Sequence, residues 1–143
     1  MNREGRVVPA DLPRTEFLHW VLVDLTPDVD ELPEGACSDG VAARGKSDPP
    51  GPGASRQGVN DYTGWFARDA EMAGTYLGYD GPGPPWNDER LHRYRFELLA
   101  LDVDRLELAA EFGLADFRVA SEGHVLERVA ITGTYTMNPR MRA

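Results

Sequence analysis

The segment Tyr79–Leu101 reads YDGPGPPWNDERLHRYRFELLAL and places a rigid turn directly before a strand. The turn, Gly81–Pro85, holds three prolines, which fix φ, and two glycines, which tolerate φ > 0 and let another group approach the backbone. After the turn the polarity alternates with period two, which predicts a β-strand with His92 and Tyr94 side by side on its apolar face. We expect the rest of the chain to support this turn and strand.

Apolar residues recur at strand or helix spacing in three other segments. Residues 16–26, EFLHWVLVDLT, are apolar on both faces and predict a central strand that is covered on both sides. Residues 131–137 alternate and predict a closing strand. Residues 113–130 have apolar side chains three to four apart and predict one or two short helices, interrupted at Gly123. The pattern therefore indicates a mainly β fold.

The remaining segments read as loops within one domain, because 143 residues suit a single domain of ordinary size. Residues 1–14 contain two prolines and scattered charges and predict an exposed arm. Residues 44–60 are dense in Gly, Pro and Ser, which predicts a long surface loop. A short turn of helix is expected near residues 69–72.

Composition excludes several classes of partner. The net charge of −9 argues against nucleic acid, which requires a basic surface. Cys37 is the single cysteine, so the sequence predicts no intrachain disulfide and fits a reducing cytoplasm. The N-terminus lacks an apolar leader region and no apolar run approaches the length of a membrane span, so we expect a soluble, cytoplasmic protein.

Two histidines on predicted strands, His19 and His92, are the candidate chemical groups. Imidazole, the phenol of Tyr94 and the free amides of the Gly-rich turn can all donate hydrogen bonds to a small anion. The alternative is that each histidine is an ordinary core residue. His124 is expected at the surface, and the histidine spacing does not fit a zinc site, so we predict no metal and no cofactor. No Gly-x-Ser-x-Gly motif of a hydrolase is present.

The central segment also carries a family resemblance. The run Tyr-x-Gly-Pro-x-Pro-Pro, followed by His-Arg-Tyr-x-Phe, resembles the second signature of the phosphatidylethanolamine-binding protein family, which includes the Raf kinase inhibitor-like proteins of bacteria. The matching residues are Tyr79, Gly81, Pro82, Pro84, Pro85, His92, Arg93, Tyr94 and Phe96. The family usually has a glycine shortly before the histidine, whereas this chain has WNDERL at residues 86–91. We therefore expect a bulkier and more charged rim.

The resemblance implies a fold and a function. The fold is a central antiparallel-rich sheet with a second small sheet and short C-terminal helices, in one domain. The function is non-enzymatic binding of a small anion or a phospholipid head group. The ligand-binding residues carried over are His19, Tyr79, Gly83, Pro84, Pro85, His92 and Tyr94. Modulation of a protein kinase is known in the family, but no protein partner is identified by this sequence. Two alternatives remain open: a phosphoester hydrolase that uses His19 and His92, and a degenerate fragment without a working pocket.

One feature of the family is absent. Its first signature holds an Asp-Pro-Asp-x-Pro segment before the His-Trp pair, and no such segment precedes His19. The resemblance therefore implies an N-terminally shortened member. Without the preceding strands, Leu18, Trp20 and Leu22 are expected to add to an exposed apolar patch. The protein should then either form a homo-oligomer or be less stable than a longer chain.

Overall fold

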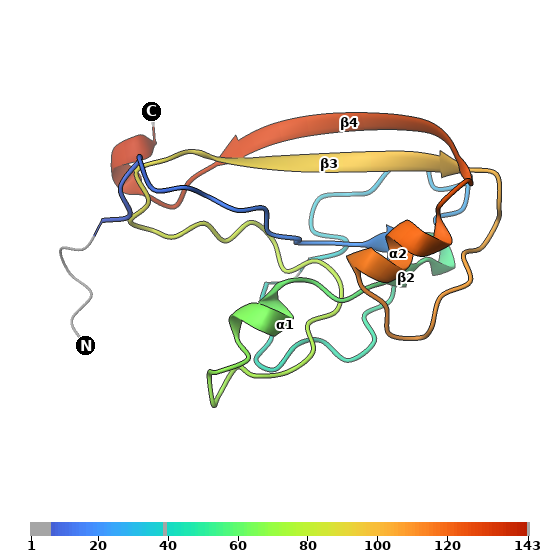
Figure 1. Ribbon diagram of the computed structural model, residues 1–143, viewed down its shortest axis with the longest axis horizontal. Coiled ribbons are helices and arrows are strands. Elements are labelled where there is room, and N and C mark those ends of the chain that lie inside the picture. The colour runs from blue at the N-terminus through green and yellow to red at the C-terminus, as the bar shows by residue number, and fades with distance from the viewer. Residues whose placement is uncertain (1–6, 39, 143) are drawn as a thin grey trace. The chain divides into compact units, whose positions relative to one another are not determined.

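The computed structural model describes residues 7–38 and 40–142 (Figure 1). Contacts group the chain into two compact units. We call residues 7–16, 82–99 and 128–142 the ribbon unit, and residues 17–38, 40–81 and 100–127 the core unit. The organisation as a single domain stays a prediction.

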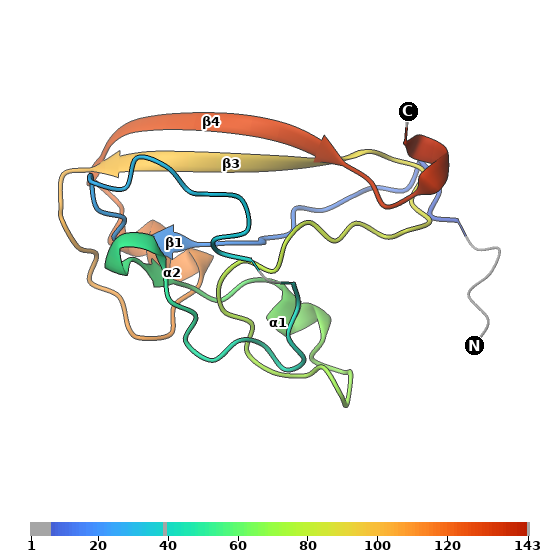
Figure 2. The same cartoon turned by 180° about the vertical axis from the view of Figure 1, so that it is seen from behind.

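The strand predicted after the Gly/Pro turn is confirmed. It is β3, His92–Leu101, and it forms a two-stranded sheet with β4, Val125–Tyr135. The two strands run side by side in opposite directions (Figures 1 and 2). Partly buried His92 and Tyr94 alternate with exposed Arg93 and Arg95 along β3, as the period of two predicts. A short 3-10 helix, η2, Pro139–Met141, follows β4.

The described part of the predicted N-terminal arm is anchored within the ribbon unit. Val8 and Asp88 form an isolated parallel bridge. The Val8 amide donates to the carbonyl of Asn87 at 3.0 Å, and the Glu89 amide donates to the carbonyl of Val8 at 3.0 Å. These bonds fix the chain on both sides of Asp88.

The core unit is built around a short antiparallel ladder. Strand β1, Leu22–Val23, pairs with β2, Arg56–Gln57, so that Leu22 lies opposite Gln57 and Val23 opposite Arg56. Only two residues of the strand predicted over residues 16–26 belong to this ladder. The buried cluster beneath it consists of Val21, Val23, Leu106 and Phe112, and α2, Leu114–Ala120, packs against it. Helix α2 confirms the first half of the helical prediction for residues 113–130.

The prediction of a surface loop is wrong for residues 55–60. After η1, Pro52–Ala54, the side chains of Ser55, Gln57 and Asn60 are buried. The segment is polar, yet its polar groups have partners: Asn60 Nδ2 donates to the carbonyl of Gly78 at 2.8 Å, and its Oδ1 accepts from the Tyr62 amide at 3.0 Å. Burial of such groups is tolerated because their hydrogen bonds are made.

Arg56 holds several parts of the core unit together. Its Nε donates to Asp24 Oδ2 at 2.7 Å, while the other guanidinium nitrogens donate to the carbonyls of Leu106 at 2.8 Å and Leu108 at 3.1 Å. The guanidinium also lies 5.6 Å from the ring centroid of Phe112. The rigid, five-donor fork of arginine suits this role.

Two further local predictions need correction. Residues 125–130 were expected to be helical but belong to β4. Their apolar side chains have helical spacing, yet the pairing of this segment with β3 outweighs that pattern. Val125 and Val129 are also β-branched, which favours a strand. Helix α1, Tyr62–Trp65, begins earlier than the expected turn near residues 69–72. At that turn, Asp69 Oδ1 accepts hydrogen bonds from the backbone amides of Glu71 and Met72, each at 3.0 Å. The mainly β class is confirmed, although the two sheets found within residues 7–38 and 40–142 are each two-stranded.

The expected exposed patch at Leu18, Trp20 and Leu22 is also absent, since all three side chains are partly buried. Leu18 packs against the core cluster. Trp20 donates through Nε1 to Gln57 Oε1 at 2.7 Å, and its ring lies 5.4 Å from that of Tyr79. Elements of the core unit itself therefore cover this face.

Candidate functional site

Asp88 is the centre of a buried polar network in the ribbon unit. Only 1% of the surface of Asp88 is exposed to solvent. Oδ1 accepts from an Arg14 guanidinium nitrogen at 2.6 Å and from the Arg90 amide at 2.9 Å, while Oδ2 accepts from Arg14 Nε at 3.0 Å and from His92 Nε2 at 2.8 Å. The Asp88 carbonyl accepts from Asn138 Nδ2 at 2.8 Å. Both carboxylate oxygens are thus fully engaged.

This network keeps the carboxylate ionised. Burial alone would raise the pKa of Asp88, but the hydrogen bonds from Arg14, His92 and the Arg90 amide and the charge of Arg14 lower it to about 2. An ionised carboxylate can only accept, so His92 Nε2 carries the shared proton. The Arg14 guanidinium offsets the negative charge that would otherwise lie beside the histidine.

His92 is therefore oriented, and its Nδ1 lies outside the Asp88 network. Because Nε2 donates to Asp88, Nδ1 accepts a hydrogen bond when the ring is neutral and donates one when the ring is protonated. In the same unit, Tyr94 lies two residues further along β3 on the face that His92 occupies. Pro84 is buried, whereas Gly83 and Pro85 are exposed.

His19 lies in an aromatic cluster of the core unit. Its ring is 4.8 Å from that of Phe17 and 5.7 Å from that of Tyr62. The rings of Phe17 and His19, two residues apart in the sequence, therefore lie together. Residue 19 is partly buried. Phe17 and Tyr62 thus limit the positions that the imidazole can take.

Tyr79 also belongs to the core unit, and Lys46 links its backbone carbonyl to a second buried carboxylate, that of Asp80. Lys46 Nζ donates to the Tyr79 carbonyl at 2.6 Å and forms an ion pair with Asp80 Oδ1 at 3.0 Å. Asp80 Oδ2 accepts from Asn60 Nδ2 at 2.9 Å. Burial raises the pKa of Tyr79, which keeps its phenol protonated at neutral pH.

The predicted site residues thus fall into two sets. His19 and Tyr79 belong to the core unit, and the other five, Gly83, Pro84, Pro85, His92 and Tyr94, belong to the ribbon unit. In the ribbon unit, Asp88 contacts His92. In the core unit, Phe17 and Tyr62 contact His19. The assembly of both sets into one pocket stays a prediction.

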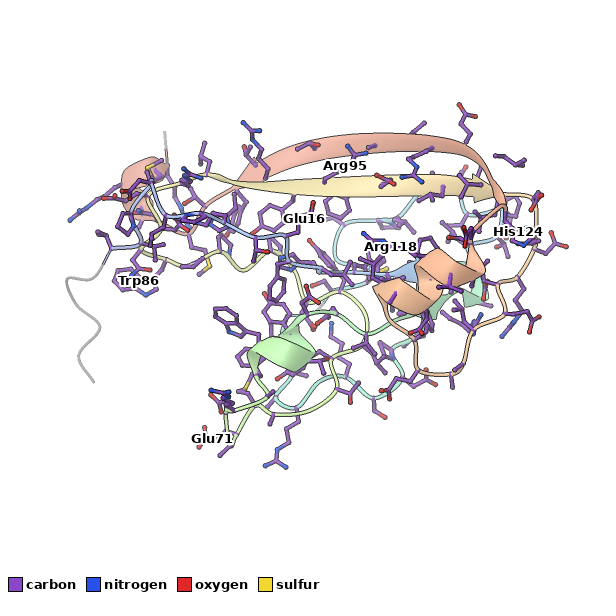
Figure 3. The ribbon with its side chains drawn as sticks, in the orientation of Figure 1. Glu16, Glu71, Trp86, Arg95, Arg118 and His124 are labelled. Atoms are coloured by element: carbon purple, nitrogen blue, oxygen red, sulfur yellow. The ribbon has the colours of Figure 1, made fainter. Side chains whose placement is uncertain are left out.

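Sequence reasoning missed the residues that orient these groups. Residues 86–91 were expected to form a bulkier and more charged rim of the site, which stays a prediction. Trp86, labelled in Figure 3, is exposed, as is Glu89, whereas Asp88 is buried. No local pattern marks Asp88 as the partner of His92, because a spacing of four residues brings side chains together on a helix and not between a turn and a strand. Nothing in the sequence links it to Arg14, which lies 74 residues away.

An open groove of about 420 Å³ lies beside this network in the ribbon unit. It is lined by Val7, Trp86, Asn87, Glu89, Asn138, Pro139, Arg140 and Met141. None of the seven predicted site residues lines it. Within residues 7–38 and 40–142, no three His, Cys, Asp or Glu side chains gather as a metal ion would require. None of the helices in the described part of the chain has the length and hydrophobicity needed to cross a bilayer.

Comparison with known proteins places the chain in a family. The family model "Phosphatidylethanolamine-binding protein" matches residues 7–136. A UPF0098 protein of Methanothermobacter thermautotrophicus is 35% identical over 125 residues, which cover 87% of this chain and 66% of the relative. A UPF0098 protein of Aquifex aeolicus is 32% identical over 127 residues, or 87% of this chain and 60% of the relative. The chain thus spans less than two thirds of the length of these relatives. It belongs to the phosphatidylethanolamine-binding protein family.

Proposed function

We propose that the chain is a non-enzymatic, Raf kinase inhibitor-like binding protein for a small anionic group, either a free anion or the phosphate of a phospholipid head group. Family membership supports a small ligand. The ligand-binding residues in this proposal are His19, Tyr79, Gly83, Pro84, Pro85, His92 and Tyr94.

The observation that carries the proposal is the orientation of His92. Asp88 fixes the ring through Nε2 at 2.8 Å and leaves Nδ1 for another partner. A protonated His92 donates through Nδ1, and Tyr94 on the same face and the amides of the neighbouring Gly/Pro turn are further donors. Arg14 compensates the Asp88 charge, so the carboxylate repels an anion less than an isolated one would.

The proposal is one of binding without catalysis, and it gives Asp88 no role as a general base. A general base must take up a proton in the reaction, and Asp88 is held ionised by Arg14, so it is a poor acceptor near neutral pH. Its role in this proposal is to position His92. In this proposal the ligand is bound and released unchanged.

Affinity should depend on pH, because only protonated imidazole offers a donor at both ring nitrogens. Calorimetric titration with sulfate, whose charge is constant over this range, should show binding at least about threefold tighter near pH 6 than near pH 8. Phosphoethanolamine titrated in parallel tests the head group. Equal sulfate affinity at both pH values would remove the histidines from charge recognition.

Three matched variants test the residues. His92→Gln and His19→Gln should each weaken binding by about tenfold or more, which corresponds to the loss of one charge-assisted hydrogen bond. His124→Gln is the control, because His124, labelled in Figure 3, pairs with Asp102 through Nδ1 at 2.7 Å and is not among the proposed site residues. Thermal melts verify that each variant is folded. Unchanged affinity in both test variants would refute the proposal.

A further inference from the structure

Strand β4 is exposed along its whole length. All eleven residues from Val125 to Tyr135 are exposed. The exposed fraction is 70% for Leu126, 55% for Val129 and 72% for Ile131. Isolated apolar side chains on a surface are ordinary, but a continuous strand of them is a feature of surfaces that bind another chain.

The outer edge of β4 is also unpaired in the described part of the chain. Its sheet contains β3 as the single neighbour. An edge strand presents a row of free N–H and C=O groups, and such a row is a template for pairing with another strand. Native proteins commonly protect long edges with lysine, proline or a bulge. The sequence of β4, VLERVAITGTY, contains neither lysine nor proline.

The charges of β4 permit self-pairing despite the net charge of −9. The strand carries one acid, Glu127, and one base, Arg128, so it is locally neutral. Arg128 already forms an ion pair with Glu97 of β3 at 2.8 Å. Like charges that face each other across a strand pair are destabilising, so the permitted registers are those that keep each charge away from its own copy.

One antiparallel register satisfies these conditions over the full strand. With Ala130 opposite Ala130 of a second copy, all eleven residues have a partner. Val129 then faces Ile131, an apolar β-branched pair of the kind that stabilises sheets. Glu127 faces Gly133, and Arg128 faces Thr132, so no like charges are opposed. We propose that two copies of this chain pair through β4 in this register, which joins two ribbons into one four-stranded sheet.

Cysteine cross-linking tests the register. In a Cys37→Ser background, Ala130→Cys places the new thiol opposite its own copy, where directly opposed Cα atoms lie about 4.5–5.5 Å apart, within disulfide range. Thr134→Cys is the matched control on the same strand. In this register the Thr134 positions of the two copies lie eight residues apart along the strands, or about 27 Å. Mild oxidation should give a covalent dimer for Ala130→Cys and little for Thr134→Cys.

Sedimentation of the 143-residue chain tests the association itself. The wild-type protein should be a dimer at micromolar concentrations, and Ile131→Lys should shift it to a monomer, because lysine on an edge strand opposes strand pairing. Leu98→Lys is the control, since Leu98 is 59% exposed on the same ribbon but belongs to β3. A monomeric wild-type protein, a dimer that Ile131→Lys leaves intact, or equal cross-linking at positions 130 and 134 would overturn the proposal.

Discussion

Replacing Asp88 with asparagine should lower the free energy of unfolding by about 3 kcal/mol. The amide cannot accept the charge-assisted bonds from Arg14 and His92 at both oxygens, and it leaves the guanidinium without its counter-charge. Urea unfolding followed by tryptophan fluorescence measures the change. Asp104→Asn is the control, because Asp104 is exposed and should alter the stability by less than about 0.5 kcal/mol.

The same network predicts the acid response of the wild-type protein. The pKa of Asp88 is about 2 in the folded protein, below its ordinary value of 3.8, so its contribution is complete above the ordinary value and is lost as the pH falls through about 2. The difference amounts to about 2 kcal/mol. In Asp88→Asn this part of the acid destabilisation should be missing. A stability gap between wild type and variant that stays constant down to pH 2 would contradict the role given to Asp88.

Replacing Arg56 with methionine should destabilise the protein by about 3 kcal/mol or more. Methionine retains part of the packing of the side chain but removes three hydrogen-bonded contacts, and it leaves the buried Asp24 carboxylate without a cation. The same urea titration measures the loss. Arg68→Met, at an exposed position, is the control and should have little effect.

A double-mutant cycle separates the ion pair from the rest of the Arg56 contacts. The double variant Asp24→Asn/Arg56→Met should lose about 1–2 kcal/mol less stability than the two single variants lose in sum. The reason is that neither charge of the ion pair is then left without its partner. Strict additivity would show that Arg56 acts through the carbonyls of Leu106 and Leu108 alone. The Arg56→Lys variant should fall between wild type and Arg56→Met, since lysine keeps the charge but not the fork.

Local periodicity predicted strand β3, which carries two of the seven candidate site residues, His92 and Tyr94. Strand β3 follows from the alternation after the Gly/Pro turn, and the turn itself follows from its composition. The helix at residues 114–120 was predictable for the same reason, because it depends on side chains close in sequence.

Long-range pairing could not be read from the same patterns. Residues 55–60 look like a loop by composition, yet they are buried because Asp24, Leu106 and Gly78, which are distant in sequence, supply hydrogen-bond partners. Residues 125–130 fit a helix by spacing, yet β3 recruits them into a strand. The contact between Arg14 and Asp88 is likewise invisible before the chain is folded.

Reversible binding of an anionic head group is tested most directly by equilibrium dialysis of the purified chain against phosphoethanolamine, with mass spectrometry of the recovered ligand. We expect saturable binding that is weakened in His92→Gln and unchanged in His124→Gln, with the ligand recovered intact. Inorganic phosphate released by the wild-type chain and lost in His92→Gln would contradict this account in favour of hydrolysis. The absence of saturable binding by a folded wild-type chain would contradict it in favour of a degenerate fragment.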